Sequence, residues 1–381
     1  MKRILCVFCV FVIFAQVGVF AAEPVEGGLA LSAKSSILIE QRTGEVLYEE
    51  NADERLPIAS VTKVMTMLLI VEAIDAGVIS SDDTVCVSNE ASKMGGSQIY
   101  LEAGEEMSVH DMLKGIAVAS GNDASAAMAE FLMGNVDVFV DAMNRRAGEL
   151  GMVNTHYMNV HGLDEDGHYS SARDVAIVSR ELMSHPIILE YTTIWMDSLR
   201  NGEFSLVNTN KLIRFYSGAN GLKTGSTSKA GYCLSASANR NDMQLIAVVL
   251  GAENSDGRFA TATKLLDYGF ANYAVAGEEP GETEIAAVYV SKGESREVDV
   301  SVDGNFGVLV SKNKQGQIKK EIVIEAGVAA PVEKGQKVGE LEYWLDGQRI
   351  GSADIVASEA VGKVGVLAMI KTIFVRWLSF S

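Results

Sequence analysis

The sequence predicts a large α/β (α+β) domain, with an antiparallel sheet flanked by helices, followed by a small all-β C-terminal domain. Strand-like segments occur near residue 40 and again after Gly221, and the segments between them have helical periodicity. Beyond residue 281, apolar and polar residues alternate strictly between turn signals. A chain of 381 residues, 48% of them hydrophobic, is long enough to bury one large and one small core.

Residues 1–21 have the pattern of a secretory signal peptide. Lys2 and Arg3 form a short basic segment, Ile4–Phe14 is apolar, and Val19-Phe20-Ala21 fits a small-x-small cleavage site. We expect cleavage after Ala21, and an uncleaved anchor is the alternative. The sequence therefore predicts an exported protein on the periplasmic or cell-wall side of the cytoplasmic membrane.

The chain is acidic and poor in cysteine. Its formal net charge of −18 repels nucleic acid and argues against a polyphosphate ligand. Only Cys86 and Cys233 follow the predicted signal peptide, so they could form one disulfide at most. Cys233 lies in an apolar run, where we expect a buried free thiol. No cysteines and histidines have metal-ligand spacing, so we predict no metal and no cofactor.

The large domain is predicted to span residues 22–278. It opens with SILIEQRTGEVLYEE, which predicts a hairpin that turns at Thr43-Gly44. The apolar face of the next segment is broad enough for a helix that is buried on most sides. After Gly221, short strand-like runs follow one another. The expected helices are Val61–Ala73, Asp111–Met133 with a break at Ser120-Gly121-Asn122, Val136–Leu150 and Arg258–Tyr273.

Two further segments follow the large domain. Gly277–Gly281 has the composition of a linker, and residues 279–356 predict the small all-β domain, to which we assign a structural role. Residues 357–381 predict an amphipathic helix that is too short to span a bilayer. We expect this helix to lie in the plane of the membrane surface. The alternative is a helix that packs on its own domain or in a dimer.

Ser60 and Lys63 lie three residues apart in PIASVTKVMTMLLIVEA, at the start of the apolar helix. This spacing places both side chains on one helix face. A serine hydroxyl becomes a nucleophile when a base takes its proton, and a first-turn serine also offers its backbone N–H to an oxyanion. The same spacing occurs at Ser226/Lys229 and Ser311/Lys314, so spacing alone also fits a serine that caps a buried helix.

A lysine acts as a base only when it is neutral, and burial and a second cation both lower its pKa. The hypothesis therefore requires a second cation. Lys223 in GLKTGST is the candidate, with Gly225 allowing a substrate backbone to approach closely. Ser120 could relay a proton between Lys63 and a leaving group, and Asn122 offers a donor and an acceptor to a substrate amide. A helix break with an Asx cap is the alternative for these two residues.

Three motifs occur in order: Ser60-x-x-Lys63, Ser120-Gly121-Asn122 and Lys223-Thr224-Gly225. They resemble the motifs of the penicillin-binding protein and serine β-lactamase superfamily. Four longer segments are similar to low-molecular-mass penicillin-binding proteins, the serine-type D-alanyl-D-alanine carboxypeptidases of peptidase family S11: RLPIASVTKVMT, ASGNDASAAMAE, NTHYMNVHGLDEDGHYSSARDVA and GANGLKTGSTSKAGYCLSASA. The resemblance implies a penicillin-binding/β-lactamase-like transpeptidase fold, a small β-rich domain and a C-terminal amphipathic membrane anchor.

The resemblance also implies an activity and a role in cell-wall organisation and cell shape. The enzyme would remove the terminal D-alanine from peptidoglycan stem pentapeptides through an acyl-enzyme on Ser60, and β-lactams would acylate the same serine. Lys63 would be the general base, and Ser120 and Lys223 would complete the proton network. The resemblance also assigns three contacts with the substrate. Asn122 would bind the peptide amide, and Thr224 would bind the substrate carboxylate. The backbone N–H groups of Ser60 and Ser226 would bind the oxyanion.

Some positions match the family only in part. Arg258 in SDGRFATA matches an arginine placed near the substrate carboxylate, and a surface arginine in a first helical turn is the alternative. Ser226 stands where some members have histidine, which leaves the deacylation rate open. Some relatives have arginine near the position of Asn208. We interpret His161 as structural and Asp174 as a helix cap.

Three other functions are alternatives to the carboxypeptidase. A class A β-lactamase needs a glutamate-x-x-leucine-asparagine run, which is missing. A D-alanyl-D-alanine endopeptidase would use the same residues, and the β domain and tail favour the carboxypeptidase. A non-catalytic envelope scaffold is disfavoured because all three motifs are intact. The sequence leaves a homodimer possible.

Overall fold

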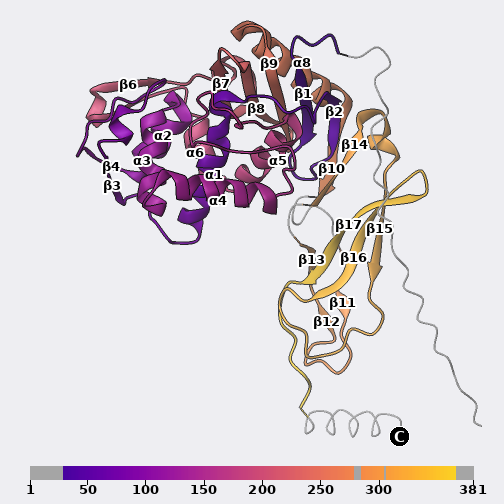
Figure 1. The fold of residues 1–381 in the computed structure, drawn as a ribbon. Coiled ribbons are helices and arrows are strands. Elements are labelled where there is room, and N and C mark those ends of the chain that lie inside the picture. Colours follow the sequence, from indigo (N-terminus) through magenta and orange to yellow (C-terminus); the bar gives the residue numbers. More distant parts are fainter. Residues whose placement is uncertain (1–28, 279–284, 304–305, 366–381) are drawn as a thin grey trace, which may run out of the picture.

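The computed structural model describes residues 29–278, 285–303 and 306–365. The predicted signal peptide lies outside these residues. Figure 1 shows a larger body that contains the described α-helices and a smaller, β-rich body attached to it. The two-domain prediction therefore agrees with the architecture.

The larger domain is built on a five-stranded antiparallel sheet with the order β2-β1-β9-β8-β7. Strand β1 pairs with β2 in the predicted hairpin and with β9 on its other side. Strands from both ends of the domain therefore meet in one sheet, as predicted. The strands are β1 (Ser35–Glu40), β2 (Val46–Glu50), β7 (Ala219–Thr227), β8 (Gly231–Arg240) and β9 (Met243–Ala252).

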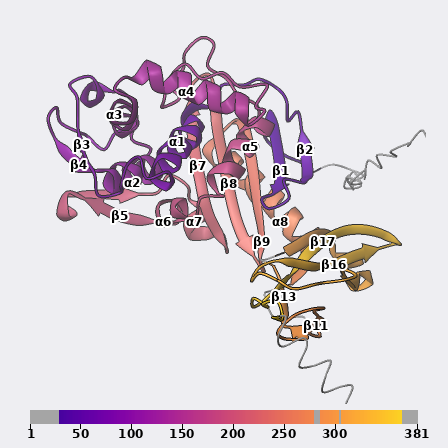
Figure 2. The same ribbon diagram turned by 90° about the horizontal axis from the view of Figure 1, so that it is seen from below.

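Helices cover both faces of this sheet. Successive strand residues point to opposite faces, so Leu38 and Leu245 pack with α8, whereas Ile37 and Ile246 belong to the core that contains α1 and α5. Figure 2 shows α8 on the opposite side of the sheet from α5. The helices are α1 (Lys63–Asp75), α2 (Val109–Ala119), α3 (Asn122–Met133), α4 (Val136–Glu149), α5 (Ala172–Leu182), α6 (Leu189–Thr192), α7 (Leu212–Phe215) and α8 (Ser255–Asn272).

The predicted helices form, with some ends displaced. A 3₁₀ turn, η1 (Ala59–Thr62), precedes α1, which therefore begins at Lys63. The predicted break between α2 and α3 occurs because Ser120 adopts a left-handed backbone conformation, with φ of 64°. Asn254 caps α8 by accepting a hydrogen bond from the Gly257 N–H, so this helix starts three residues earlier than predicted.

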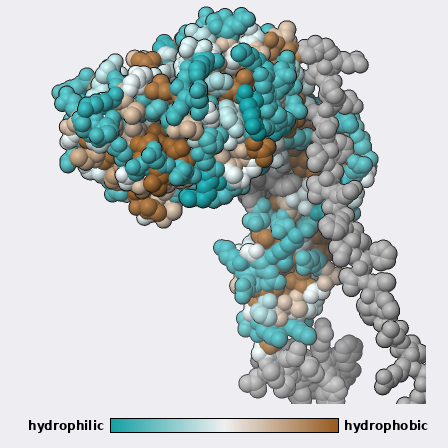
Figure 3. All heavy atoms as spheres, in the orientation of Figure 1, coloured by the Kyte–Doolittle hydropathy of each residue, from teal (hydrophilic) through white to brown (hydrophobic). Residues whose placement is uncertain are grey.

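Two short hairpins extend the helical side of the larger domain. They are β3 (Thr84–Cys86) with β4 (Glu106–Ser108), and β5 (Met196–Leu199) with β6 (Phe204–Val207). Cys233 is a buried free thiol, as predicted, and Cys86 is exposed and also free. On the face that Figure 3 shows, hydrophilic residues cover most of both domains, which fits the acidic composition.

The smaller domain is all-β, as predicted. It contains a four-stranded sheet with the order β13-β17-β16-β15 and a separate core of its own. Gly277, predicted to begin a linker, instead lies in β10 (Tyr273–Glu278), which pairs with β14 (Phe306–Ser311). The other strands are β11 (Val288–Tyr289), β12 (Glu297–Val298), β13 (Val300–Val302), β15 (Lys319–Ile324), β16 (Lys337–Leu345) and β17 (Gln348–Ala357).

The start of the predicted terminal helix is wrong. Ala357 ends β17, Val361 bridges to Val332, and Lys363 bridges to Gly293. Val361 is buried in the core of the β domain, so packing overrides the helical pattern there. The rest of that prediction, residues 366–381, lies outside the described residues. None of the described helices has the length and apolar character needed to cross a membrane.

Candidate active site

Ser60 and Lys63 lie at the junction of η1 and α1. The tight 3₁₀ turn places side chains three residues apart over one another, and the Lys63 Nζ atom lies 3.0 Å from the Ser60 Oγ atom. Lys63 is fully buried, whereas Ser60 is partly exposed. The hydroxyl is therefore open to a substrate while the amine beside it is shielded from water.

The serine is held against the edge strand of the large sheet. A Cβ atom on Gly225 of β7 would lie 2.7 Å from the Ser60 backbone nitrogen and 2.9 Å from the Ile58 carbonyl oxygen. Only glycine allows the strand to approach η1 this closely. The sequence assigned this glycine to the approach of a substrate backbone, and the structure shows that it also admits the turn carrying the nucleophile.

The electrostatic surroundings keep both site lysines less basic than usual. Burial, and then the charge of Lys223, lowers the pKa of Lys63 well below its ordinary value, although Asp123 acts in the opposite direction. Burial, and then Arg258, lowers the pKa of Lys223 to about 7. The second cation that the hypothesis required is therefore near Lys63, which can be a neutral proton acceptor.

The Ser120-Gly121-Asn122 motif approaches Lys63 from the α2–α3 junction. The Asn122 Oδ1 atom accepts a hydrogen bond of 2.6 Å from Lys63, and its Nδ2 atom donates one of 2.6 Å to the Gly95 carbonyl. Ser120 is buried, and its Oγ atom has no hydrogen-bond partner within the described part of the chain. An unpaired buried hydroxyl is costly in a purely structural role, so it is available to a reacting group.

The residues predicted to bind the substrate carboxylate and the oxyanion lie on β7 and on helix α8. Thr224 is buried, and its hydroxyl donates to Thr209 Oγ1 at 2.7 Å. Ser226 is exposed, near the end of the strand. Arg258 is buried rather than on the surface, and its Nη1 atom donates to the Gly225 carbonyl at 3.0 Å. The guanidinium therefore lies behind the strand and brings its positive charge close to the site.

The structure adds one contact that the sequence did not predict. The carbonyl oxygen of His161 accepts a hydrogen bond of 2.8 Å from Lys63 Nζ. The His161 imidazole accepts from the Leu163 N–H through Nδ1, and burial followed by the charge of Lys63 lowers its pKa to about 4. The ring thus has the structural role predicted for it, whereas its backbone carbonyl faces Lys63.

A second buried histidine supports the turn that carries the nucleophile. His168 Nδ1 accepts from the Met158 N–H at 3.0 Å, and the Thr62 hydroxyl donates to the Ala59 carbonyl at 2.8 Å. His168 Nε2 must therefore donate in its 2.7 Å contact with Thr62 Oγ1. Burial lowers the pKa of His168 to about 4, which keeps this neutral tautomer. Sequence alone gave no signal for this contact.

Asn208 and Asp174 have structural roles. Asn208 donates hydrogen bonds to the Thr192 and Ile194 carbonyls, so it links the segment before α7 to the end of α6 and the chain that follows it. The prediction that Asp174 caps a helix is wrong, because Ser171 is the N-cap of α5. The Asp174 carboxylate instead accepts from the Asn154 N–H and the Thr155 hydroxyl, both at 2.7 Å, since those groups face it across a loop.

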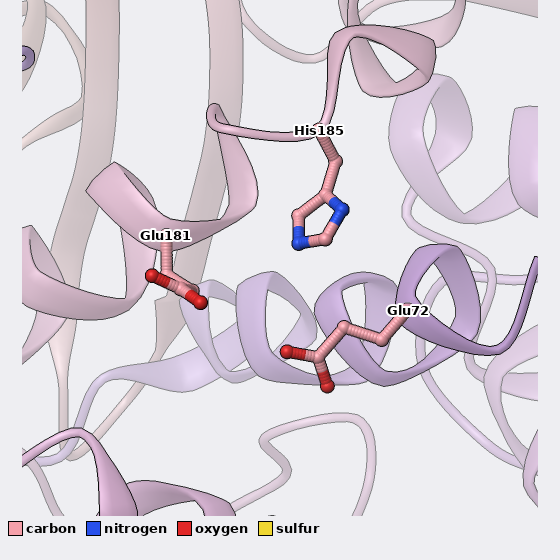
Figure 4. Close-up of side chains that lie close together, drawn as sticks. All are labelled: Glu72, Glu181 and His185. Atoms are coloured by element: carbon pink, nitrogen blue, oxygen red, sulfur yellow. The ribbon is translucent and has the colours of Figure 1, made fainter. Parts of the chain in front are cut away.

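Away from this site, Glu72, Glu181 and His185 form the one group of possible metal ligands among the described residues. Figure 4 shows their side chains directed toward one another. The Arg146 Nη2 atom lies 2.7 Å from Glu72 Oε1 and 2.6 Å from Glu181 Oε1, so a guanidinium already neutralises both carboxylates. We assign no metal to this group.

Comparison with known families identifies the larger domain. Residues 20–254 match the family model described as D-alanyl-D-alanine carboxypeptidase. The chain belongs to that family. Residues 279–363 match the model of the penicillin-binding protein 5 C-terminal domain. The family prediction is therefore confirmed, and with it the serine-type carboxypeptidase activity and the penicillin-binding protein fold.

Two individual relatives resemble nearly the whole chain, and a third resembles 64% of it. The D-alanyl-D-alanine carboxypeptidase DacF of Bacillus subtilis is 46% identical over 93% of this chain and 92% of its own length. The structure of penicillin-binding protein 5 from Haemophilus influenzae has a TM-score of 0.70 and 33% identity, and covers 88% of this chain and 99% of its own. Penicillin-binding protein D2 of Listeria monocytogenes, solved in an ampicillin-bound form, has a TM-score of 0.59 and 35% identity over 64% of this chain and 99% of its own.

Proposed function

We propose that the protein removes the terminal D-alanine from peptidoglycan stem pentapeptides through an acyl-enzyme on Ser60. The observation that carries this proposal is the contact of 3.0 Å between the Ser60 hydroxyl and Lys63, a buried amine whose pKa burial and a neighbouring cation lower. Full-length similarity to a carboxypeptidase supports this activity over that of an endopeptidase.

In the first step, the Ser60 Oγ atom attacks the carbonyl carbon of the penultimate D-alanine, and its proton passes to Lys63. The oxyanion that forms is stabilised by the backbone N–H groups of Ser60 and Ser226. The carbon–nitrogen bond then breaks, and a proton reaches the departing D-alanine amine from Lys63 through Ser120. Water, with Lys63 again as base, attacks the ester and releases the shortened peptide and Ser60.

The substrate groups that do not react are assigned to the neighbouring motif residues. Asn122 binds the peptide amide through the second N–H of its Nδ2 group, while the first keeps its bond to the Gly95 carbonyl. Thr224, beside Gly225 on β7, redirects its hydroxyl proton from Thr209 to the terminal carboxylate. Lys223 and Arg258 add positive charge behind this strand, which favours an anionic chain end. β-Lactams acylate Ser60 in the same way, because their strained amide occupies the position of the peptide bond.

We also propose that residues 1–21 direct export and that the C-terminal amphipathic segment attaches the protein to the membrane surface. The basic and apolar pattern of each segment supports this location. Sedimentation with anionic lipid vesicles, compared between the mature chain and a variant ending at residue 365, tests the attachment. Analytical ultracentrifugation without vesicles determines whether the mature chain forms a homodimer.

The decisive test is covalent labelling. The mature protein is incubated with a fluorescent penicillin, and mass spectrometry locates the adduct, with Ser60→Ala beside it. We expect one adduct per chain, on Ser60, and none in the variant. Folded wild-type protein that forms no adduct would refute the mechanism and favour the non-catalytic scaffold. Release of free D-alanine from a pentapeptide, compared with cleavage of a cross-linked dimer, distinguishes the carboxypeptidase from an endopeptidase.

A further inference from the structure

The three oxygen neighbours of Lys63 determine where its lone pair points. A neutral amine has two N–H bonds to donate and one lone pair that accepts. The Asn122 Oδ1 atom at 2.6 Å and the His161 carbonyl oxygen at 2.8 Å can only accept, whereas the Ser60 hydroxyl at 3.0 Å can donate. The two pure acceptors take both N–H bonds, which leaves the lone pair for the Ser60 proton.

The orientation of both acceptors is fixed by further contacts. The bond from Asn122 Nδ2 to the Gly95 carbonyl makes the amide oxygen face Lys63. The His161 carbonyl belongs to a loop, and Asn159 holds that loop in a tight turn. The Asn159 Oδ1 atom accepts from the Gly162 N–H at 2.7 Å and from the His161 N–H at 3.3 Å. An asparagine that binds the backbone two and three residues on forms an Asx turn.

Every polar atom of the Asn159 side chain is used in this turn. Its Nδ2 atom donates to the Leu163 carbonyl at 3.1 Å and to Glu165 Oε2 at 2.9 Å. The residue is only 8% exposed. A buried side chain with four fixed contacts gives the backbone around His161 little freedom to rotate.

The turn lies directly against the backbone that precedes the nucleophile. Gly162 has φ of +89°, and a Cβ atom there would lie 1.9 Å from the Ala59 carbonyl oxygen and 2.8 Å from Thr62 Oγ1. Since no side chain separates the turn from η1, a displaced turn would move the His161 carbonyl relative to both Ser60 and Lys63.

We infer that Asn159 is a positioning residue for the base: by closing the turn at His161 and Gly162, it directs the His161 carbonyl to Lys63 and thereby aims the amine lone pair at Ser60. The inference rests on the proposed role of Lys63. Asn159 needs no contact with substrate for this role. The other charged or titratable groups near Lys63 are Lys223 on β7, Asp123 on α3 and the His161 imidazole in the turn itself, whose pKa of about 4 lies below the pH range of the test.

The test is the rate of Ser60 acylation by a fluorescent penicillin between about pH 5 and about pH 10. In Asn159→Ala we expect the plateau rate constant to fall about 10- to 100-fold, a part of what a positioned base contributes. The acid limb of the profile should also move to lower pH, because the ammonium form loses an acceptor. Asn159→Ser, whose hydroxyl can accept from the Gly162 N–H, should recover part of the rate.

Asn144→Ala is the matched control. Asn144 accepts from the Tyr157 N–H at 2.8 Å and donates to the Tyr157 carbonyl at 2.8 Å, so it anchors the same segment without contacting His161. Its loss should lower the melting temperature and leave the acylation rate constant and its pH profile unchanged.

A wild-type rate and pH profile in Asn159→Ala would overturn the inference, as would an equal loss of rate in Asn144→Ala. If Asn159→Ala does not fold, Asn159→Ser takes its place. For this variant we expect an acylation rate several-fold below wild type and a displaced acid limb. A wild-type profile in the serine variant would overturn the inference. Failure of the proposed function would be seen separately, as wild-type protein without an adduct on Ser60.

Discussion

The pKa values of particular lysines shift in opposite directions in the two domains. In the larger domain Lys63 and Lys223 are buried, and neither forms an ion pair within the described residues, so burial lowers the pKa of both. In the β domain Lys337 lies 2.6 Å from Glu340 and 2.7 Å from Asp354, and these hydrogen bonds raise its pKa to about 12. The same side chain is thus a potential base in one domain and a permanent cation in the other, because of its partners.

We expect the largest effect on acylation when the base, Lys63, is replaced by a permanent cation. Lys63→Arg places a guanidinium at the site, which stays protonated and cannot take the Ser60 proton. We expect the acylation rate constant to fall about 10²- to 10⁴-fold, as measured by stopped-flow with a fluorescent penicillin. The equivalent change in the β domain, Lys337→Arg, should leave acylation unchanged. A loss of less than about tenfold in Lys63→Arg would show that another group is the base.

A smaller effect is expected from removing the second cation. The pKa of Lys223 falls from 10.5 to about 7 on folding, so between these values the unfolded chain binds more protons than the folded chain. The wild-type free energy of unfolding therefore rises with pH across this interval. Lys223→Met should show a smaller rise in melting temperature from about pH 7 to about pH 10, measured by calorimetry.

The same variant should change the acylation profile. Without the charge of Lys223, the pKa of Lys63 rises, so the acid limb of acylation should move to higher pH. Lys337→Met is the control in both measurements. An acid limb that stays in place, with an unchanged slope of melting temperature against pH, would contradict the coupling between the two buried lysines.

The smallest effect should come from the β domain. Lys337→Met removes two ion pairs that solvent screens, and such pairs contribute little to stability. We expect wild-type acylation and a slight decrease in melting temperature that disappears at high salt. A clear loss of acylation in this variant would mean that the β domain influences the site, contrary to the structural role that we predict for it.

The chemistry of the site was largely predictable because short motifs carry it. Because Lys63 must be neutral to act as a base, the sequence predicted a second cation near it. Lys223 lies close enough for its charge to lower the pKa of Lys63. The His161 carbonyl could not be predicted, since a backbone group leaves no trace in residue type. The Asn159 turn had a weak signal in MNVHGLD, where an asparagine stands three residues before a glycine.

The sequence predictions were wrong for segments in which tertiary contacts override the local sequence pattern. Val361 belongs to a stretch whose periodicity predicts a helix, yet it pairs with Val332 and is buried in the β core. Gly277 lies in a segment with the composition of a linker, yet it pairs with Gly307 between strands β10 and β14. Asp174 stands in the first turn of a helix, but its partners Asn154 and Thr155 arrive from a distant loop. In each case the deciding contact is remote in sequence.

The place of β1 within the large sheet has a consequence for the order of folding. Ile37 pairs with Val248, so the first strand of the domain acquires its central neighbour only after nearly the whole domain has been synthesised. Pairing over such a sequence separation is intrinsically slow. The ribosome therefore completes Ser60 and Lys63 long before the sheet can assemble around them. If residues 1–21 direct export as proposed, this delayed closure gives the chain time to pass a secretion channel before its sheet forms.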